Sequence, residues 1–184
     1  MSHSDPARAI RVWDPFVRVF HWTLVSCVFL NFFVIDDGET LHEWTGYAAS
    51  ALVGARIVWG FVGSRHARFA DFFPTVSTIR HHLRTLVSGE PDFHAGHNPL
   101  GAVMMLALMA LVLGLGVTGF MQDLDAFWGE EWLQDLHATL ASTLIGLAGL
   151  HAAAAVFMSH RERTNLIGAM LTGVKVRSEP NRRR

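Results

Sequence analysis

Four stretches of the chain are almost free of charged side chains. Residues 19–35, 93–122 and 136–160 contain no Asp, Glu, Lys or Arg, and residues 44–64 contain only Arg56. A helix of roughly 20 apolar residues matches the hydrocarbon thickness of a bilayer. The pattern therefore predicts an all-α membrane protein, a four-helix transmembrane bundle with spans at about 16–35, 41–63, 98–120 and 133–158.

The composition favours a membrane protein over a soluble helical one. Of the 184 residues, 51% are hydrophobic and only 17% are charged, which is low for a soluble domain. The alternative is a soluble all-α core with unusually apolar helices, and the length of the uncharged stretches disfavours it. We expect one four-span domain at residues 16–172, between a cytoplasmic N-terminal segment at 1–15 and a basic cytoplasmic tail at 173–184.

The placement of positive charge predicts the orientation of the bundle. Of fifteen Lys and Arg residues, three precede the first span, four lie between the second and third, and seven follow the fourth. The other two connections contain no Lys or Arg but hold nine carboxylates, at Asp36, Asp37, Glu39, Glu43, Asp123, Asp125, Glu130, Glu131 and Asp135. Because cytoplasmic loops are enriched in Lys and Arg, both termini are expected in the cytoplasm.

The long inner connection contains a helix of a different kind. In PTVSTIRHHLRTLVSG, the apolar residues Val76, Ile79, Leu83 and Leu86 recur at helical spacing, with arginines and histidines on the other faces. An amphipathic, basic helix is typical of the membrane surface. We therefore expect a cytoplasmic interfacial helix between spans two and three.

Four histidines lie within the predicted spans, where ionisable residues are costly and usually functional. His137 and His151 are fourteen residues apart in the fourth span, which places them on one helix face, about 21 Å apart along the axis. Chain direction puts His42 at the outer depth of His137, and His21 at the inner depth of His151. The histidines therefore form two layers, each with two imidazoles from different helices.

Two opposed imidazoles at one depth suit the axial positions of a haem held inside a helix bundle. We expect two haems b, an outer one bound by His42 and His137 and an inner one bound by His21 and His151. Bis-histidine ligation leaves no open position on the iron, which favours electron transfer over substrate chemistry. Covalent c-type haem is excluded, because the chain has one cysteine, Cys27, and no Cys-x-x-Cys-His motif.

Arg56 and His97 are further candidates for cofactor binding. Arg56 lies fourteen residues after His42, so it shares that helix face and falls at the inner depth, where a haem propionate would satisfy its charge. The alternative is that Arg56 extends to the cytoplasmic interface. His97 precedes the third span on the cytoplasmic side, where it would hydrogen-bond a propionate, accept a proton from quinol, or simply begin the helix.

A histidine-based metal transporter or sensor is the alternative from another functional class. Zinc sites bring three or four ligands together at one point. Each histidine layer supplies only two, and Cys27 has no partner thiol. The pattern therefore favours haem over zinc or copper.

Several segments resemble the bacterial cytochrome b561 and nickel-iron hydrogenase B-type cytochrome family. They are FHW in the first span, LHEWTGY at the start of the second and LHATLASTLIGLAGLHAAAAV in the fourth. RIVWGFVGSRHARF, residues 56–69, is similar to the hydrogenase-type branch and to the cytochrome b partners of small soluble haem proteins. The resemblance covers about residues 10–172. It implies a di-haem cytochrome b of the bacterial inner membrane, with the ligands His21, His42, His137 and His151.

The resemblance also implies electron transport in a respiratory chain, between the quinone pool and a periplasmic redox partner. That partner would be a cytochrome c-like protein or a dehydrogenase or hydrogenase subunit. One branch of the family oxidises superoxide at its outer face, so a superoxide:quinone oxidoreductase is the alternative. Steering an anion requires a positive surface, whereas a face with nine carboxylates suits a basic cytochrome or oxidoreductase subunit. The expected partners are therefore the lipid bilayer, quinone and this basic periplasmic cytochrome or oxidoreductase subunit, and no nucleic acid is expected.

Overall fold

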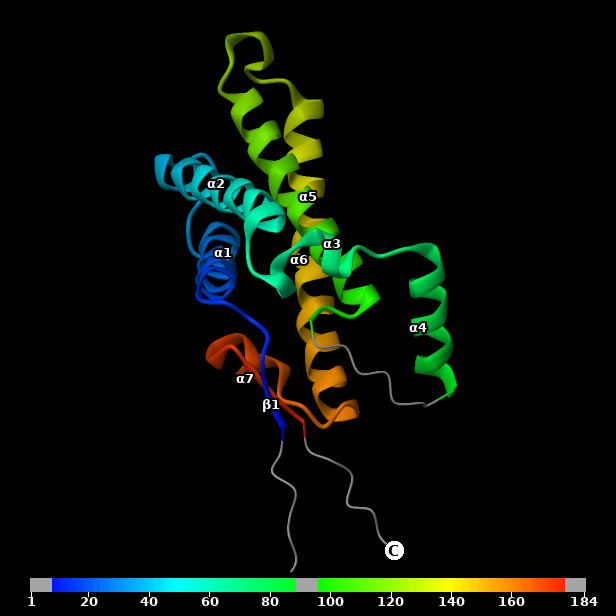
Figure 1. The fold of residues 1–184 in the computed structure, drawn as a ribbon. Coiled ribbons are helices and arrows are strands. Elements are labelled where there is room, and N and C mark those ends of the chain that lie inside the picture. The colour runs from blue at the N-terminus through cyan, green and yellow to red at the C-terminus, as the bar shows by residue number, and fades with distance from the viewer. Residues whose placement is uncertain (1–7, 89–95, 178–184) are drawn as a thin grey trace, which may run out of the picture.

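The computed structural model describes residues 8–88 and 96–177, and most of them are helical (Figure 1). The four long helices are α1 (Pro15–Phe33), α2 (Thr40–Val62), α5 (Pro99–Gln122) and α6 (Glu131–Arg161). The shorter ones are η1 (Arg65–Ala67), α3 (Phe69–Phe72), α4 (Val76–Ser88), η2 (Asp125–Phe127) and α7 (Leu166–Thr172). The start of the predicted N-terminal segment and the end of the predicted basic tail lie outside the described residues.

The four long helices coincide with the four predicted spans to within a few residues. Within the described ranges, α1, α5 and α6 are long and apolar enough to cross a membrane. Helix α2 has 23 residues, but His42, Glu43 and Arg56 make it less apolar. The prediction of a helical, multi-pass membrane protein is confirmed.

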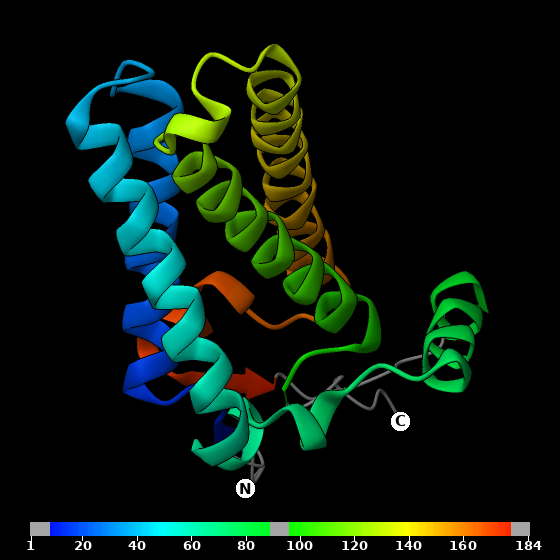
Figure 2. The same cartoon turned by 90° about the horizontal axis from the view of Figure 1, so that it is seen from above.

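The long helices pack in sequence order, with α1 against α2, α2 against α5, and α5 against α6 (Figures 1 and 2). One hydrophobic core draws on all four of them, through Phe20, Ala49, Val53, Met109, Val112 and Leu144. Gly116 allows the close approach of α5 to α2, because a Cβ atom there would overlap the side chain of Ser50. Many large apolar side chains remain exposed on the outer surface, as expected for helices in contact with lipid.

Two short strands, which the hydrophobic pattern did not predict, join the terminal segments. Strands β1 (Arg8–Arg11) and β2 (Val174–Arg177) pair antiparallel, with Ile10 opposite Lys175. A four-residue strand carries too little periodic signal to detect, and this pair forms only because α7 returns the chain toward α1. The sheet places the beginning and the end of the described chain at the same end of the molecule (Figure 1).

Asp14 ties the start of α1 to the end of α2. Its carboxylate accepts hydrogen bonds from the Val17 amide at 2.9 Å, the Trp59 indole at 3.0 Å and the Ser64 hydroxyl. Burial alone would raise the pKa of Asp14, but the bonds from Ser64, Val17 and Trp59 outweigh burial and lower it. The carboxylate therefore stays ionised and fixes the end of the bundle from which the sheet extends.

Helix α4 stands apart from the four long helices (Figure 1). Val76, Leu83 and Val87 are exposed, whereas His82 and Thr85 are buried on the side that faces the protein. The helix is anchored by Arg161, whose guanidinium donates to the Thr85 carbonyl at 3.0 Å. The predicted amphipathic helix is therefore present.

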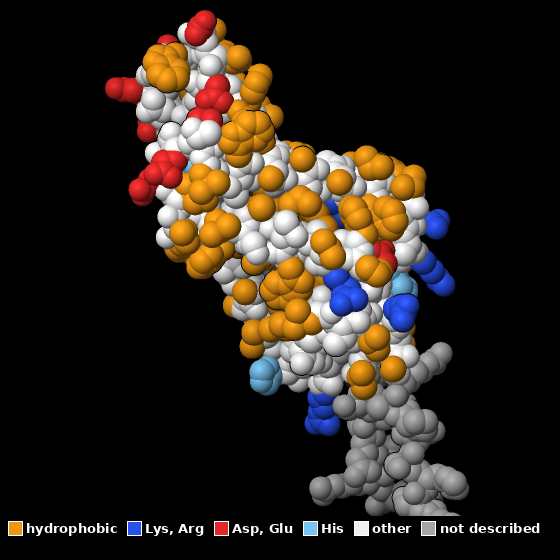
Figure 3. Space-filling view, turned by 90° about the vertical axis from the view of Figure 1, so that its left-hand side faces the viewer, with side chains coloured by type: hydrophobic (Ala, Val, Ile, Leu, Met, Phe, Trp, Pro, Cys, Tyr) orange, Lys and Arg blue, Asp and Glu red, His pale blue; other side chains and the backbone are white. Residues whose placement is uncertain are grey.

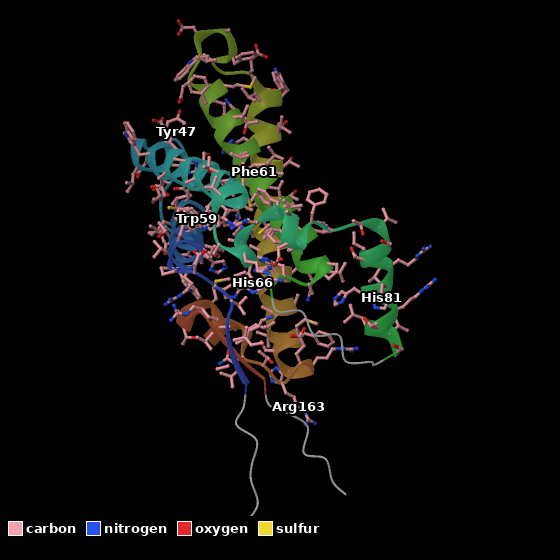
Figure 4. All side chains as sticks on the ribbon, viewed as in Figure 1. Tyr47, Trp59, Phe61, His66, His81 and Arg163 are labelled. Atoms are coloured by element: carbon pink, nitrogen blue, oxygen red, sulfur yellow. The ribbon has the colours of Figure 1, made fainter. Side chains whose placement is uncertain are left out.

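Charge is segregated along the molecule. Figure 3 shows acidic side chains gathered at one end, Lys and Arg side chains toward the other, and hydrophobic side chains between them. The acidic end is formed by the α1–α2 connection and the segment from α5 to α6, and the basic end by the opposite helix termini. In Figure 4, Arg163 lies at the basic end, far from Tyr47, whose hydroxyl donates to Asp123 at 2.6 Å near the acidic end.

Candidate cofactor site

The structure brings together both histidine pairs that the sequence predicted. The His21 and His151 rings, from α1 and α6, have centroids 6.5 Å apart and planes inclined at 53°. The His42 and His137 rings, from α2 and α6, have centroids 6.3 Å apart and planes inclined at 57°. Helix α6 thus supplies one ring to each pair, at two depths.

The spacing of each pair fits a metal ion held between two imidazoles. A metal–nitrogen bond of about 2 Å on each side places two opposed ring centres roughly 6 Å apart. The Nδ1 atoms of His21 and His42 are buried and make no hydrogen bond. Buried ring nitrogens are normally satisfied, so these two rings differ from core histidines that are held by hydrogen bonds to neighbouring side chains. The donor set, two neutral imidazoles on opposite sides, is the set that ligates haem iron in an electron carrier.

Arg56 lies inside the protein at the inner end of α2. Its side chain is only 1% exposed, so the guanidinium is covered by protein and does not reach solvent. One nitrogen donates to the Ala67 carbonyl at 3.0 Å, and the guanidinium carbon lies 5.5 Å from the centre of the Phe69 ring. The other terminal nitrogen, Nη1, is buried without a hydrogen bond. A buried guanidinium with a free donor is well suited to an anionic group.

Arg18 is a second arginine with a free donor, and sequence reasoning missed it. It lies one helical turn before His21 on α1 and donates to the Leu171 carbonyl, while its Nε is buried and makes no hydrogen bond. Its position three residues before His21, on the same face of α1, is the sequence feature that could have identified it as a candidate. Arg18 had been counted only as one of the charges that predict membrane orientation.

His97 sits in an aromatic enclosure just before α5. Its ring centroid is 4.7 Å from that of Trp13 and 5.0 Å from that of Phe72. Burial, followed by the positive charges of Arg56 and Lys175, lowers the pKa of His97 to about 3. The imidazole is therefore neutral at physiological pH, and its buried Nδ1 makes no hydrogen bond. His97 is thus more than a residue that begins a helix.

A cavity of about 460 Å³ opens beside His97, between α3, α4 and the start of α5. Aromatic, hydroxyl and imidazole side chains line it, including Phe72, Phe73, Ser77, His81, His82 and His97. Its size and mixed lining match those of a site for a small organic molecule. It lies at the basic end of the protein, next to the outward-facing apolar stripe of α4.

At the acidic end, His137 is held by a hydrogen bond to a buried threonine. Its Nδ1 lies 2.8 Å from the Thr118 hydroxyl, which donates to the Gly114 carbonyl at 2.9 Å. The Nδ1 of His42 lies 3.9 Å from the exposed carboxylate of Asp37. Thr118 was not among the predicted site residues, because a threonine within an apolar span carries no distinctive pattern.

The part of the chain that the structure describes contains no group of three or more His, Cys, Asp and Glu side chains placed to hold a metal ion. The histidines meet in twos, each pair drawn from two helices. A zinc or copper site of three or four protein ligands is therefore not formed within those residues.

These features define a class: a helical membrane protein with two facing pairs of imidazoles inside its bundle. The comparison with known families agrees, because the sequence profile of the prokaryotic cytochrome b561 family matches residues 12–173. The chain belongs to this family. Membership implies binding of haem b and electron transfer in a membrane.

The chain is also similar to individual proteins of known description from other bacteria. The chain is 26% identical over 156 residues to a probable Ni/Fe-hydrogenase B-type cytochrome subunit of Azotobacter vinelandii, an alignment covering 70% of this chain and 65% of that protein. It is 27% identical over 167 residues to a protein of the same description from Bradyrhizobium diazoefficiens, covering 77% and 67% of the two chains. The chain therefore spans about two thirds of the length of these relatives.

Proposed function

We propose that the protein is a di-haem membrane cytochrome b that carries electrons between the quinone pool and a redox partner at its acidic face. The proposal rests on two pairs of neighbouring imidazole rings in a protein of the cytochrome b561 family. Within the pairs, the ring centroids are 6.5 Å and 6.3 Å apart. His42 and His137 bind the outer haem, and His21 and His151 the inner one. When bound, each haem supplies a one-electron redox centre.

We propose that four helices span the membrane: α2 in addition to α1, α5 and α6. Helix α2 is packed between α1 and α5 and exposes Leu41, Trp44, Val58, Phe61 and Val62, while its Arg56 is buried. An arginine directed inward with apolar side chains directed outward suits a helix in lipid. The excess of Lys and Arg at the end where β1 and β2 meet supports cytoplasmic termini in a bacterial inner membrane.

The inner site is adapted to hold an acidic cofactor. The free donors of Arg56 and Arg18 would hydrogen-bond the propionates of the inner haem and compensate their charge. Arginine suits this role because its guanidinium stays protonated even when it is buried. Both side chains are already fixed by bonds to backbone carbonyls, so little ordering is required when the cofactor binds.

The cavity beside His97 is the proposed quinone site, at the cytoplasmic end. Phe72 and Phe73 provide an apolar lining for a quinone ring, and neutral His97 can accept a hydrogen bond or a proton from quinol. The exposed stripe of α4 supports a position of the cavity near the membrane surface, within reach of quinone in the bilayer.

The partner at the acidic face is proposed to be a basic cytochrome or an oxidoreductase subunit. Both relatives are described as probable Ni/Fe-hydrogenase B-type cytochrome subunits, which supports an oxidoreductase subunit as the partner. Nine carboxylates without a Lys or Arg in the two outer segments suit a basic docking surface and disfavour superoxide, an anion.

The proposal is tested by the haem content of single histidine variants. Purified protein is expected to show a reduced low-spin haem b spectrum with two haems per chain. His137→Ala and His151→Ala should each retain one haem, because each removes one ligand from a different pair. His160→Ala, an exposed histidine on the same helix, serves as the matched control and should retain two.

A colourless protein that retains stoichiometric zinc would overturn the proposal in favour of the metal transporter or sensor. Loss of both haems in His160→Ala together with retention in His137→Ala would also contradict the ligand assignment.

A further inference from the structure

One buried hydroxyl distinguishes the outer histidine pair from the inner pair. Among the four proposed ligands, all of them in the described part of the chain, His137 is the one whose ring nitrogen takes part in a hydrogen bond. The bond joins α6 to Thr118 on α5, and Thr118 is only 6% exposed. The two haem sites therefore differ in what surrounds their ligands.

The hydrogen-bond chain is compatible with the His137 tautomer that a metal requires, in which Nδ1 carries the proton and the Thr118 hydroxyl donates to the backbone. A threonine hydroxyl has one proton, and Thr118 is placed to give it to the Gly114 carbonyl at 2.9 Å. In that arrangement its oxygen accepts from His137 Nδ1 at 2.8 Å, and Nδ1 carries the hydrogen. A neutral imidazole has one N–H, which leaves Nε2 with a free lone pair for a metal.

We propose that Thr118 is a positioning residue that orients His137, strengthens it as an axial ligand and lowers the midpoint potential of the outer haem. The inference rests on the proposed function. A hydrogen bond from the remote ring nitrogen makes a ligating imidazole more basic and holds its plane. A more basic axial ligand stabilises the oxidised, more positive iron. His21 lacks this bond in the inner pair, so the effect is confined to one haem.

The test is a redox titration of the purified protein, followed by its visible spectrum. In Thr118→Val, which removes the hydroxyl and keeps the shape, the midpoint potential of one haem should rise by up to about 59 mV, which for one electron is a tenfold fall in the oxidised-to-reduced ratio at a fixed ambient potential. The other haem should not change. Thr118→Ser, which keeps the hydroxyl, should titrate like the wild type.

Thr143→Val is the matched control, since Thr143 is an exposed threonine whose hydroxyl donates to the carbonyl four residues earlier, at 2.7 Å. It should leave both potentials unchanged. Thr118→Ala is measured alongside, so that the result does not depend on how valine packs. Loss of one haem in both Thr118→Val and Thr118→Ala, with two retained in Thr118→Ser, supports the inference too, because such outer bonds contribute about 10–100-fold to metal affinity.

Unchanged potentials in Thr118→Val and Thr118→Ala, with two haems bound, would overturn the role of Thr118 and leave the proposed function intact. An equal shift in Thr118→Ser would also overturn it, because the hydroxyl would then not be the cause. A wild-type protein without haem would instead overturn the proposed function itself.

Discussion

At the scale of single residues, the basic end of the protein surrounds a neutral imidazole with positive charge. His97 is enclosed by Trp13 and Phe72, and the charges that face it belong to Arg56 and Lys175. Burial makes the largest contribution, and the neighbouring cations add to it in holding the pKa of His97 at about 3. A histidine kept neutral in this way is available as a hydrogen-bond or proton acceptor.

The protonation of His97 predicts an acid-sensitive step in stability. Its folded pKa of about 3 lies below the usual 6.5, so the unfolded chain binds one more proton between those values. Stability is therefore complete above about pH 6.5 and is lost as pH falls toward 3, by about 1.4 kcal/mol per pH unit for one proton. His97→Phe should weaken the fall in unfolding temperature between pH 7 and 5, measured in detergent.

Other groups also titrate in this range, so the difference between wild type and His97→Phe is the informative quantity. His81→Phe, at an exposed histidine, is the control and should follow the wild-type profile. Parallel acid profiles for wild type and His97→Phe would show that folding does not lower the pKa of His97.

At the scale of elements, α4 presents an apolar stripe to the outside although its mean hydropathy is too low for a span. Val76, Leu83 and Val87 are exposed, and Arg80 and Arg84 are exposed beside them. The helix is held to the bundle by its other side, where Arg161 bonds to the Thr85 carbonyl. This arrangement suits a helix lying on the membrane surface, with arginines near the lipid head groups.

Placing a charge in that stripe should loosen α4. In Val87→Glu, the lost burial of a valine in lipid costs about 1.5 kcal/mol or more, so hydrogen exchange of the α4 amides in lipid nanodiscs should quicken about tenfold. The same substituent at His81, an exposed residue of α4 that lines the cavity and not the stripe, should leave exchange unchanged. Equal protection in both variants would place the stripe away from lipid.

At the scale of the whole molecule, the separation of charge is the dominant feature. The acidic end and the basic end lie on opposite sides of the apolar middle (Figure 3). The formal net charge of −1 conceals this separation. A single-sign surface steers a partner of opposite sign and accelerates association at low salt.

Electron exchange with a basic cytochrome c should therefore slow as salt increases. Raising ionic strength from about 0.01 to 0.15 M shortens the Debye length from about 30 to 8 Å, and the second-order rate should fall about tenfold or more. Stopped-flow kinetics measure this. Asp125→Asn with Glu130→Gln should reduce the low-salt rate, whereas Asp71→Asn, at the basic end, should not.

A rate that does not respond to salt would contradict docking at the acidic face. Faster reduction by superoxide than by the cytochrome, at low salt, would favour the superoxide-oxidising alternative.

The sequence by itself determined the helices and the pairing of histidine depths. Long uncharged stretches have no stable state in lipid other than helices, because every backbone group must be bonded within the segment. The fourteen-residue interval between His137 and His151 fixes one face and two depths, since helix geometry is regular. In the structure the ring of each of these histidines has its centroid 6.3 or 6.5 Å from that of the histidine at the same predicted depth.

The tertiary structure alone decided how side chains from distant segments meet. The strand pair of β1 and β2, the enclosure of His97 by Trp13 and Phe72, and the bond from Thr118 to His137 all join residues far apart in the chain. The spacing of Arg56 in the sequence allowed its side chain to lie either inside the bundle or at the cytoplasmic interface. Only the tertiary structure shows that Ala67 and Phe69 pack around it and bury it. Periodicity reports the face and depth of a residue within its own helix, whereas these contacts depend on how helices pack against one another, and no local pattern encodes that.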